Sequence, residues 1–347
     1  DHRRMAMVQV LTPIFHPPEH GGNLQRAMAQ YGGTLSTWID CSTGIAPTPY
    51  PLPTVPAHIW QRLPDQQDGL ILVASRYYGC APEHLLAVAG SQAAIQALPT
   101  LRSRSRVGIM APSYAEHAWC WQQAGHVVIG LEPQQLEEHL HHLDVLIVVN
   151  PNNPTGQQYS KAQLRYWLSI LQQHDGWLIV DEAFADLDPQ FSLMADSHQR
   201  GLIVLRSVGK FFGLAGLRLG FVGTDARLRK KLQHRLGLWS VNGVAEWAGQ
   251  LALNDLAWQH QQRQALAAAG QWMRETLATA GLVSLSPHPM LHWCPQPHAL
   301  AWQKALAQQH VWCRVLEQPD ALRFGLIAPH QYDDFQQRLM RAAAQIT

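Results

Sequence analysis

Short apolar runs alternate with mixed segments along this chain from about residue 66 onward. The apolar runs predict buried strands, and the segments between them have the spacing of helices. Strands that are apolar throughout and alternate with helices are typical of a largely parallel sheet covered on both faces. The predicted strands are 85–89, 107–110, 127–131, 145–149, 177–180, 202–205 and, as a further candidate, 221–222.

Helices are predicted around these strands and toward the C-terminus. Glycine and proline are frequent through 16–53, which predicts irregular structure there apart from one short helix. The predicted helices are 24–31, 68–78, 93–101, 115–123, 164–173, one or two long helices within 243–280, and a last helix from about residue 331. Strand-like segments of the last part are 282–285, 311–315 and 321–327.

The composition is that of a globular protein with few charges. Charged residues make up 15% of the 347 residues, and the formal net charge is +1. There is no basic run of the kind that binds nucleic acid, so no nucleic-acid partner is expected. The longest apolar runs, such as 145–149, are far shorter than a bilayer span, and no membrane partner is expected either.

Cysteine and histidine patterns give no sign of metal chemistry. The five cysteines are scattered without a C-x-x-C pair, which favours reduced thiols in a cytoplasmic protein. No signal-peptide core follows the first residues. The 19 histidines include no H-E-x-x-H motif, so scattered solvated histidines are the better account and no metal is expected.

One lysine in apolar company follows a predicted strand. Lys210 lies in a Gly-rich turn that begins at Ser207, directly after the run 202–205. A desolvated amine has a depressed pKa and can form a Schiff base with an aldehyde. Ser207 and Arg218 can both hold a phosphate, which would leave Lys210 free for covalent chemistry.

Polar residues also follow three other predicted strands, at the edge where parallel sheets bind ligands. Ser91 and Gln92 open a helix after Gly90, and free N–H groups at a helix N-terminus bind phosphate. The rigid turn 150–156 presents Asn153 as a hydrogen-bond donor. Asp181 comes directly after a core strand and needs a cationic partner, for which a protonated pyridine nitrogen, an arginine or a metal would serve.

Together these groups match one cofactor, pyridoxal phosphate. A lysine together with an acidic partner for the pyridine nitrogen is its expected signature. The candidate cofactor ligands are Ser91, Gln92, Ser207 and Arg218 for the phosphate, Asp181 for the ring nitrogen, Asn153 for the ring oxygen and Lys210 for the aldehyde. Lys210 and Asp181 are the expected catalytic residues.

Three motifs follow each other in a recognisable order: N-P-N-N-P-T-G at 150–156, D-E-A-F at 181–184, and S-x-x-K at 207–210 with G-L-R ending at Arg218. This set resembles the aminotransferase superfamily of pyridoxal-phosphate enzymes, fold type I, from about residue 20 to the C-terminus. The resemblance implies that Arg323, in L-R-F-G, grips the substrate carboxylate. It also implies that Tyr114 stacks an aromatic ring on the cofactor.

The resemblance implies a more detailed fold. This is an α/β fold with a mostly parallel central sheet, helices on both faces, and a small α+β domain built from both termini. The implied boundaries are 1–50 for an N-terminal arm and part of the small domain, 51–228 for the large cofactor-binding domain, and 229–347 for a linking helix and the small C-terminal domain. Because the family builds its sites at a dimer interface, a homodimer is implied.

Two N-terminal segments most resemble one branch of the superfamily, the threonine-phosphate decarboxylases of cobalamin biosynthesis. They are H-G-G-N from His20 and the run S-T-G-I-A-P-T-P-Y-P that contains Gly44. In that branch these segments approach the substrate, so His20 and Gly44 join Asn153 and Arg323 as candidate substrate-binding residues. The implied substrate is a small phosphorylated amino acid.

Four positions depart from the family pattern. Phe184 stands where many aminotransferases have a tyrosine that donates to the cofactor's ring oxygen, although phenylalanine is familiar in the decarboxylase branch. Ala46 replaces the usual asparagine of I-N-P. Leu63 replaces an aromatic residue that in relatives reaches the partner subunit's cofactor phosphate, and Gly209 replaces a hydroxyl residue. The last two changes predict a modestly lower cofactor affinity.

The motifs serve two reactions equally. The bond held perpendicular to the cofactor ring is Cα–COO⁻ in decarboxylation and Cα–H in transamination, and Arg323 with the N-terminal segment would select it. A histidinol-phosphate-type aminotransferase is therefore the main alternative. A non-catalytic effector-binding module of a transcriptional regulator is a second one, although the sequence leaves no room for a winged-helix domain before residue 20.

Overall fold

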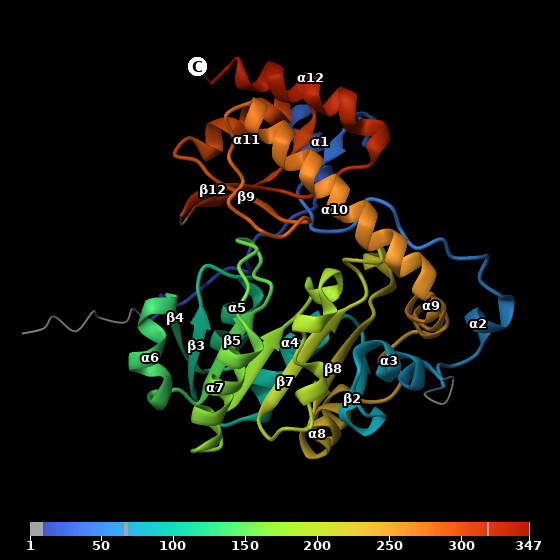
Figure 1. Ribbon diagram of the computed structural model, residues 1–347, viewed down its shortest axis with the longest axis vertical. Coiled ribbons are helices and arrows are strands. Elements are labelled where there is room, and N and C mark those ends of the chain that lie inside the picture. The colour runs from blue at the N-terminus through green and yellow to red at the C-terminus, as the bar shows by residue number, and fades with distance from the viewer. Residues whose placement is uncertain (1–9, 66–68, 318, 347) are drawn as a thin grey trace, which may run out of the picture.

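The computed structural model describes residues 10–65, 69–317 and 319–346. Asp68, the first residue of the predicted helix 68–78, lies outside them. Figure 1 shows two stacked parts, a large sheet covered by helices and a smaller part that contains the C-terminal elements. Among the described residues, no helix has the length and apolar character needed to cross a membrane.

The large part is built on a seven-stranded sheet in the order β2-β8-β7-β6-β5-β3-β4. All neighbouring strands are parallel except β8, which runs antiparallel to both β2 and β7. This confirms the predicted largely parallel sheet. The strands are β2 (Leu85–Val88), β3 (Arg106–Met110), β4 (Val127–Leu131), β5 (Val145–Val149), β6 (Trp177–Asp181), β7 (Leu202–Ser207) and β8 (Gly220–Thr224).

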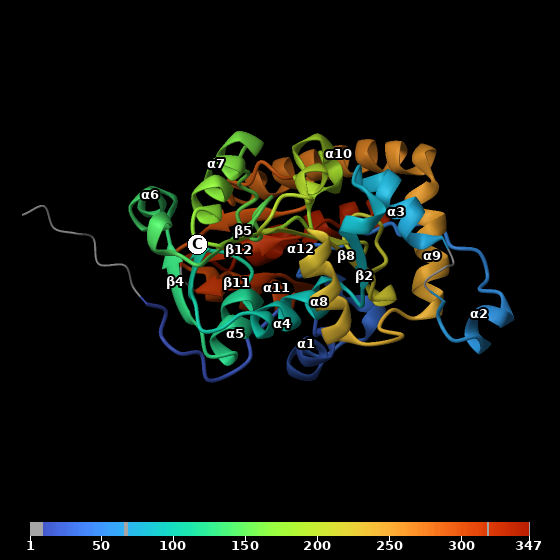
Figure 2. The ribbon, with the colours of Figure 1, turned by 90° about the horizontal axis from the view of Figure 1, so that it is seen from below.

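Helices cover both faces of this sheet, as Figure 2 shows from below. One face packs on α4 (Ser91–Ala97), α5 (Glu116–Gln123) and α8 (Ala226–Leu236). The other face packs on α3 (Leu70–Tyr78) and α7 (Lys161–Gln172). Because side chains alternate along a strand, successive residues of β6 and β7 belong to different faces. The short helices α2 (Ala57–Gln61) and α6 (Leu136–His139) complete this part.

The smaller part joins segments from both ends of the chain. Strand β1 (Ile39–Asp40) pairs in parallel with β10 (Val311–Trp312). A separate antiparallel sheet has the order β11-β12-β9, formed by β11 (Arg314–Glu317), β12 (Asp320–Phe324) and β9 (His292–Pro295). The helices are α1 (Leu24–Tyr31), α11 (Ala299–Gln308) and α12 (Tyr332–Ala343).

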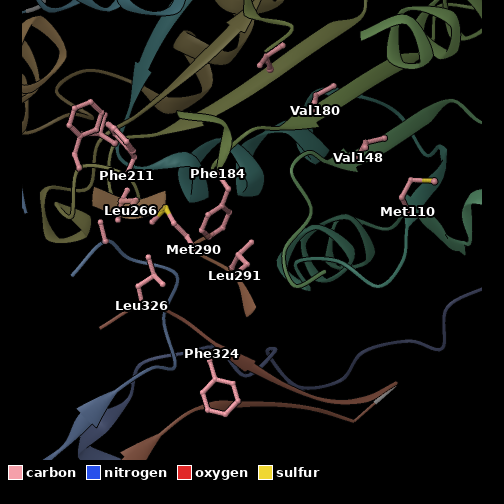
Figure 3. Close-up of a cluster of buried hydrophobic side chains, with 14 of the residues drawn as sticks. Met110, Val148, Val180, Phe184, Phe211, Leu266, Met290, Leu291, Phe324 and Leu326 are labelled. Carbon is pink, nitrogen blue, oxygen red and sulfur yellow. The ribbon is translucent and has the colours of Figure 1, made fainter. Parts of the chain in front are cut away.

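Two consecutive helices connect the parts. Helix α9 (Gly243–Asn254) leads into α10 (Leu256–Thr279), and Asp255 between them caps α10 by accepting from Trp258 N. The prediction of one or two long helices in 243–280 is thereby confirmed. Figure 1 shows α10 running from the large part to the smaller one. The buried core is also continuous, because side chains in Figure 3 extend from Val148 and Val180 past Phe184 to Leu291 and Leu326.

Several sequence-based predictions of the last part were wrong or incomplete. Residues 282–285 form no strand, although Leu285 N donates to Trp293 O at 2.9 Å. The predicted strand 311–315 is divided between β10 and β11, and β9 and α11 were not predicted. The sequence of β9, H-W-C-P, gives no sign of a strand because it mixes polar residues with proline. The domain boundaries after residues 50 and 228 stay predictions.

Candidate active site

One pocket lies at the carboxyl ends of β5, β6 and β7, where parallel sheets bind ligands. The three strands end close together because they are neighbours in register. All eight candidate cofactor residues line this pocket: Ser91, Gln92, Tyr114, Asn153, Asp181, Ser207, Lys210 and Arg218. The structure therefore brings the candidates together from six separate segments of the chain, although their roles stay predictions.

Lys210 is held in place by its backbone. Its carbonyl accepts hydrogen bonds from Ala46 N at 2.9 Å and Gly213 N at 3.2 Å. The ammonium group lies over the ring of Phe184, 5.7 Å from the ring centroid. Burial, followed by the nearby charge of Arg323, lowers the pKa of the Lys210 amine to about 8. A substantial neutral fraction near pH 8 suits this amine for attack on an aldehyde.

Asp181 has a partner that the sequence did not reveal. His117, on α5, places Nε2 at 2.7 Å from Asp181 Oδ2, and both side chains are almost fully buried. The second carboxylate oxygen accepts from Ala183 N at 3.1 Å. His117 also meets Tyr114 edge-to-face, with ring centroids 5.9 Å apart. His117 is the second residue of α5, and no motif in the sequence singles it out.

The end of the pocket that faces α4 is suited to a phosphate. Ser91 is the first residue of α4, and Ser207 Oγ accepts from Gly209 N at 3.2 Å. Arg218 is close to the turn before α4, because a Cβ built on Gly90 would lie 2.7 Å from Arg218 Nη2. Gly90 also has a positive φ of 75°, so both its backbone and this close approach favour glycine.

Arg323, on β12, contacts the pocket residue Asn153 but is not itself among the residues that line the pocket. Its Nη1 donates to Asn153 Oδ1 at 2.7 Å and its Nη2 donates to the carbonyl of Ser42. Its Nε is buried without a hydrogen-bond partner among the described residues. Burial, and next the positive charge of Arg314, lowers the pKa of Arg323 to about 10. Arg314 is its neighbour across β11 and β12, and the sequence analysis did not identify it.

The other two candidate substrate residues lie beside residues of the pocket. His20 places Nε2 at 2.7 Å from Glu116 Oε1, and its ring is 5.5 Å from the ring of Tyr114. Gly44 packs against Phe184, since a Cβ built there would lie 2.6 Å from Phe184 Cζ. Neither residue is among those that line the pocket itself.

The remaining departures from the family pattern have distinct surroundings. Ala46 is buried, and its backbone N–H holds the Lys210 carbonyl. Gly209 lies against the backbone of Ala215, where an added Cβ would be 2.9 Å from Cα. The turn therefore has little room for the hydroxyl side chain of relatives. Leu63 is 64% exposed and lines a separate groove.

Among the described residues, no group of three or more His, Cys, Asp or Glu could hold a metal ion.

The chain is similar to known proteins over most of its length. Residues 72–339 match the family model of class I and II aminotransferases. The chain is 48% identical over 310 residues to a threonine-phosphate decarboxylase of Pseudomonas aeruginosa, covering 89% of this chain and 93% of the relative. It is 38% identical over 340 residues to a threonine-phosphate decarboxylase of a Sinorhizobium species, covering 95% of this chain and 98% of the relative.

A solved structure shares the fold at low sequence identity. The histidinol-phosphate aminotransferase of Sinorhizobium meliloti, in complex with pyridoxal-5'-phosphate, superposes with a TM-score of 0.85 at 16% identity. The match covers 99% of this chain and 100% of that chain. At this identity the likeness concerns the fold alone.

Proposed function

The chain belongs to the class I and II aminotransferase family, and we propose that it is a pyridoxal-phosphate-dependent lyase acting in cobalamin biosynthesis. Its reaction is the decarboxylation of L-threonine O-3-phosphate to (R)-1-aminopropan-2-yl phosphate and CO₂. The observation that carries this proposal is the 48% identity to a threonine-phosphate decarboxylase over almost the whole length of both proteins. The pocket around Lys210 supplies the chemistry.

The residues of the pocket fit pyridoxal phosphate at each of its functional groups. We assign the phosphate to Ser91, Gln92, Ser207 and Arg218, the aldehyde to Lys210, the ring nitrogen to Asp181, the ring oxygen to Asn153 and the ring face to Tyr114. The close approach of Gly90 to Arg218 supports the phosphate assignment. When bound, the cofactor supplies an aldehyde that captures amines and a protonated ring that accepts the electron pair released at Cα.

Asp181 and His117 together serve the ring nitrogen. A buried carboxylate favours a proton on a nearby nitrogen, because an uncompensated buried charge is costly. The contact with His117, 2.7 Å long, fixes the direction in which the Asp181 carboxylate points. Lys210, with an amine pKa of about 8, can accept or deliver a proton at Cα near neutral pH.

Two arginines support a substrate with two anionic groups. Arg323 is our candidate for the substrate carboxylate, since it is buried beside Asn153. Arg314 lies next to it across the strand pair and brings a second positive charge to the same end of the site. A phosphorylated amino acid has a carboxylate and a phosphate to match them, and arginine is well suited to both. His20 and Gly44 would complete the substrate side.

A homodimer in the cytoplasm completes the proposal. Leu63, Leu238 and Trp239 are exposed large apolar side chains that line one groove of the large part. Exposed apolar patches of this kind commonly become covered when subunits associate. The dimer is tested by the molar mass of the purified protein in solution.

Product analysis tests the reaction. Purified protein supplied with L-threonine O-3-phosphate should release CO₂ even when no 2-oxo acid is added as an amino acceptor. Transfer of the amino group to 2-oxoglutarate without CO₂ release would instead assign the histidinol-phosphate type of reaction. Lys210→Ala serves as the control, because it should lose both the visible absorption of the bound cofactor and the release of CO₂. A protein that neither releases CO₂ nor transfers the amino group would support the non-catalytic effector-binding alternative.

A further inference from the structure

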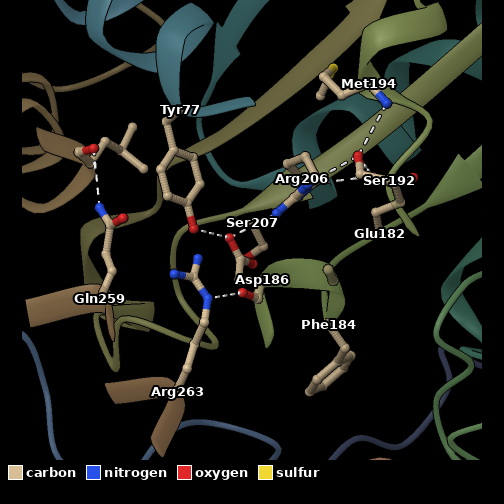
Figure 4. Close-up of polar contacts among 12 residues, drawn as sticks. Tyr77, Glu182, Phe184, Asp186, Ser192, Met194, Arg206, Ser207, Gln259 and Arg263 are labelled. Carbon is tan, nitrogen blue, oxygen red and sulfur yellow. Dashed lines mark hydrogen bonds and ion pairs between the residues drawn. The ribbon is translucent and has the colours of Figure 1, made fainter. Parts of the chain in front are cut away.

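A cluster of buried charges lies directly behind the pocket (Figure 4). Side chains alternate along β6 and β7, so that Asp181 and Ser207 lie on the sheet face that packs on α4. The adjacent residues Glu182 and Arg206 lie on the opposite face, which packs on α3. Strand geometry points Glu182 away from Asp181, and its contacts with Arg206 and Ser192 agree. Glu182, Arg206 and Ser192 have no role in the chemistry described above.

Arg206 connects two carboxylates with its two terminal nitrogens. Nη2 donates to Asp186 Oδ1 at 2.8 Å, and Nη1 lies 3.5 Å from Glu182 Oε1. Ser192 joins them, because it accepts from Nη1 at 3.2 Å and donates to Glu182 at 2.5 Å. The guanidinium plane also lies over the ring of Tyr78 at 4.7 Å. Arg206, Glu182 and Asp186 are each about 1% exposed, so water screens these contacts very little.

The cluster begins where the backbone pairing of the two strands ends. Asp181 is the last paired residue of β6, and Glu182 N donates to Leu205 O at 2.8 Å. Beyond this point the chain after β6 enters a series of turns, and the chain after β7 enters the Lys210 turn. Side chains must therefore hold these diverging segments together, and Arg206 spans from one to the other.

Asp186 carries the connection further. Tyr77, on α3, donates to Asp186 Oδ1 at 2.7 Å. Arg263, on α10, donates through Nε to the Asp186 carbonyl at 2.8 Å, and its guanidinium lies 5.3 Å from the centroid of the Phe211 ring. Phe211 follows Lys210 directly in the chain. The turn after β6 and the turn after β7 are thus tied both to each other and to α10.

Stability alone is a poor explanation for this arrangement. Two carboxylates share one buried guanidinium, and burial raises the pKa of Glu182. Arg206 Nε and Asp186 Oδ2 are buried without a hydrogen-bond partner among the described residues. Buried ion pairs often stabilise a fold no better than apolar side chains of the same volume, whereas they can specify one geometry. Here the specified geometry is that of two segments that carry Asp181 and Lys210.

We propose that Arg206 is a positioning residue: by bridging Glu182 and Asp186, it holds the segment after Asp181 at a fixed distance from the Lys210 turn. Its guanidinium is not among the groups that line the pocket, and it acts through the two backbone segments. The inference rests on the proposed cofactor site and is independent of which amino acid is the substrate. The distance between the Lys210 amine and the Asp181 carboxylate therefore depends on Arg206. The electrostatic effect of this carboxylate on the amine depends on it as well.

Two variants of the holoenzyme test this role. Arg206→Lys keeps the buried positive charge but cannot reach both carboxylates with a planar fork. The triple variant Arg206→Met, Glu182→Gln, Asp186→Asn removes all three charges, so that no unpaired charge is left in the core. Arg165→Lys is the matched control, because Arg165 makes a similar two-point contact with Asp196, at 2.6 and 3.1 Å, on the protein surface.

The measurements are the midpoint of the pH titration of the visible band of the lysine-bound cofactor and the cofactor dissociation constant from equilibrium dialysis. We expect both Arg206 variants to move the midpoint by about 0.5 to 1 pH unit and to raise the dissociation constant about tenfold. Arg165→Lys should change neither. A wild-type protein without any lysine-dependent visible band would contradict the proposed function itself, whereas the positioning role is decided by the Arg206 variants.

Two results would overturn the positioning role. One is a folded Arg206 variant with the midpoint and dissociation constant of the wild type. The other is failure of both variants to fold, because this would assign the cluster to stability alone. If only one variant folds, its midpoint and dissociation constant decide.

Discussion

Arg323 Nη1 donates to Asn153 Oδ1 over 2.7 Å, and this contact joins β12 of the smaller part to the turn after β5 of the large sheet. The residues are 170 positions apart in the chain. The candidate carboxylate ligand and the candidate ring-oxygen donor therefore orient each other. Asn153 can still donate through its amide nitrogen, because its oxygen is the atom that accepts from Arg323.

Removal of this contact should weaken substrate binding. Asn153→Ala leaves Arg323 Nη1 without its acceptor, and a hydrogen bond to a charged group contributes about 1.5 to 3 kcal/mol. We expect kcat/KM for L-threonine O-3-phosphate to fall about 10- to 100-fold, mostly through KM. Steady-state assays of CO₂ release measure it, with the exposed Arg341→Ala as control. An unchanged KM in Asn153→Ala would show that Arg323 needs no orientation by Asn153 to bind the substrate.

The lowered pKa of Lys210 should be visible in cofactor capture. The neutral amine is the nucleophile, and burial together with Arg323 lowers its pKa from 10.5 to about 8. The rate at which cofactor-free protein captures pyridoxal phosphate should therefore rise with pH and reach half of its maximum near pH 8. Stopped-flow absorbance measures this rate. Lys231→Ala, at an exposed position on α8, is the control, and a half-maximum near pH 10 in the wild type would contradict a buried amine.

His117 should matter through Asp181. Asp181→Asn removes the charge that keeps a proton on the ring nitrogen, and kcat should fall about 100-fold or more. His117→Phe keeps the carboxylate but removes its 2.7 Å partner, and a loss of about tenfold is expected from such a supporting contact. Both variants are assayed for kcat at saturating cofactor, and the two losses of kcat are compared. Equal losses would mean that His117 acts as more than an orienting partner.

The residues that line the pocket could be grouped from the sequence because they follow strands. Strand ends of a parallel sheet meet at one edge, so Asn153, Asp181 and Lys210 could be placed together from local pattern alone. His117 and Arg314 were missed for a different reason. His117 lies inside the helix after β3 and not at the strand end, and Arg314 lies in the small sheet, so each acquires its place through packing against another segment.

The small part was predicted less completely for a related physical reason. Its strands are short, and β1 has its partner β10 at the other end of the chain. Such pairing leaves no local periodicity in the sequence. The cluster around Arg206 also depends on long-range contacts, because α3 and α10 supply Tyr77 and Arg263. The alternation of Asp181 and Glu182 was nevertheless readable from the strand itself.

Two buried histidines should make the protein sensitive to acid. Burial lowers the pKa values of His288 and His292 to about 4, while in the unfolded chain they are about 6.5. As the pH falls, the unfolded state therefore binds protons before the folded state does. The stability contributed by the two neutral histidines is complete above pH 6.5 and is lost as the pH falls toward 4. Between pH 7 and 5, each histidine should lower the free energy of unfolding by about 2 kcal/mol.

Urea unfolding at a series of pH values measures this slope. His292→Gln should remove about half of the part of the slope due to the two histidines, since one of the two titrating groups is gone. The exposed His298→Gln should leave the slope unchanged. A wild-type slope in His292→Gln would mean that other groups cause the loss of stability in acid.

Gly44 should be required because of Phe184. A Cβ at position 44 would lie 2.6 Å from Phe184 Cζ and 2.7 Å from Cε1. Phe184 is 4% exposed, and its ring lies 5.8 Å from the His288 ring and 5.7 Å from the Lys210 ammonium. Gly44→Ala should therefore displace the ring beside Lys210, lower the free energy of unfolding by about 1 to 3 kcal/mol, and reduce kcat/KM about tenfold or more.

A smaller side chain at position 184 should relieve this clash. Phe184→Leu alone should cost stability, because it leaves unfilled space beside Leu291 and His288. Combined with Gly44→Ala, it should cost less than the sum of the two single changes, with a coupling of about 0.5 to 3 kcal/mol. A double-mutant cycle, measured by urea unfolding and by kcat/KM, gives this coupling. Strict additivity would show that residue 44 acts on the site independently of Phe184, and would return Gly44 to the role of a direct substrate contact.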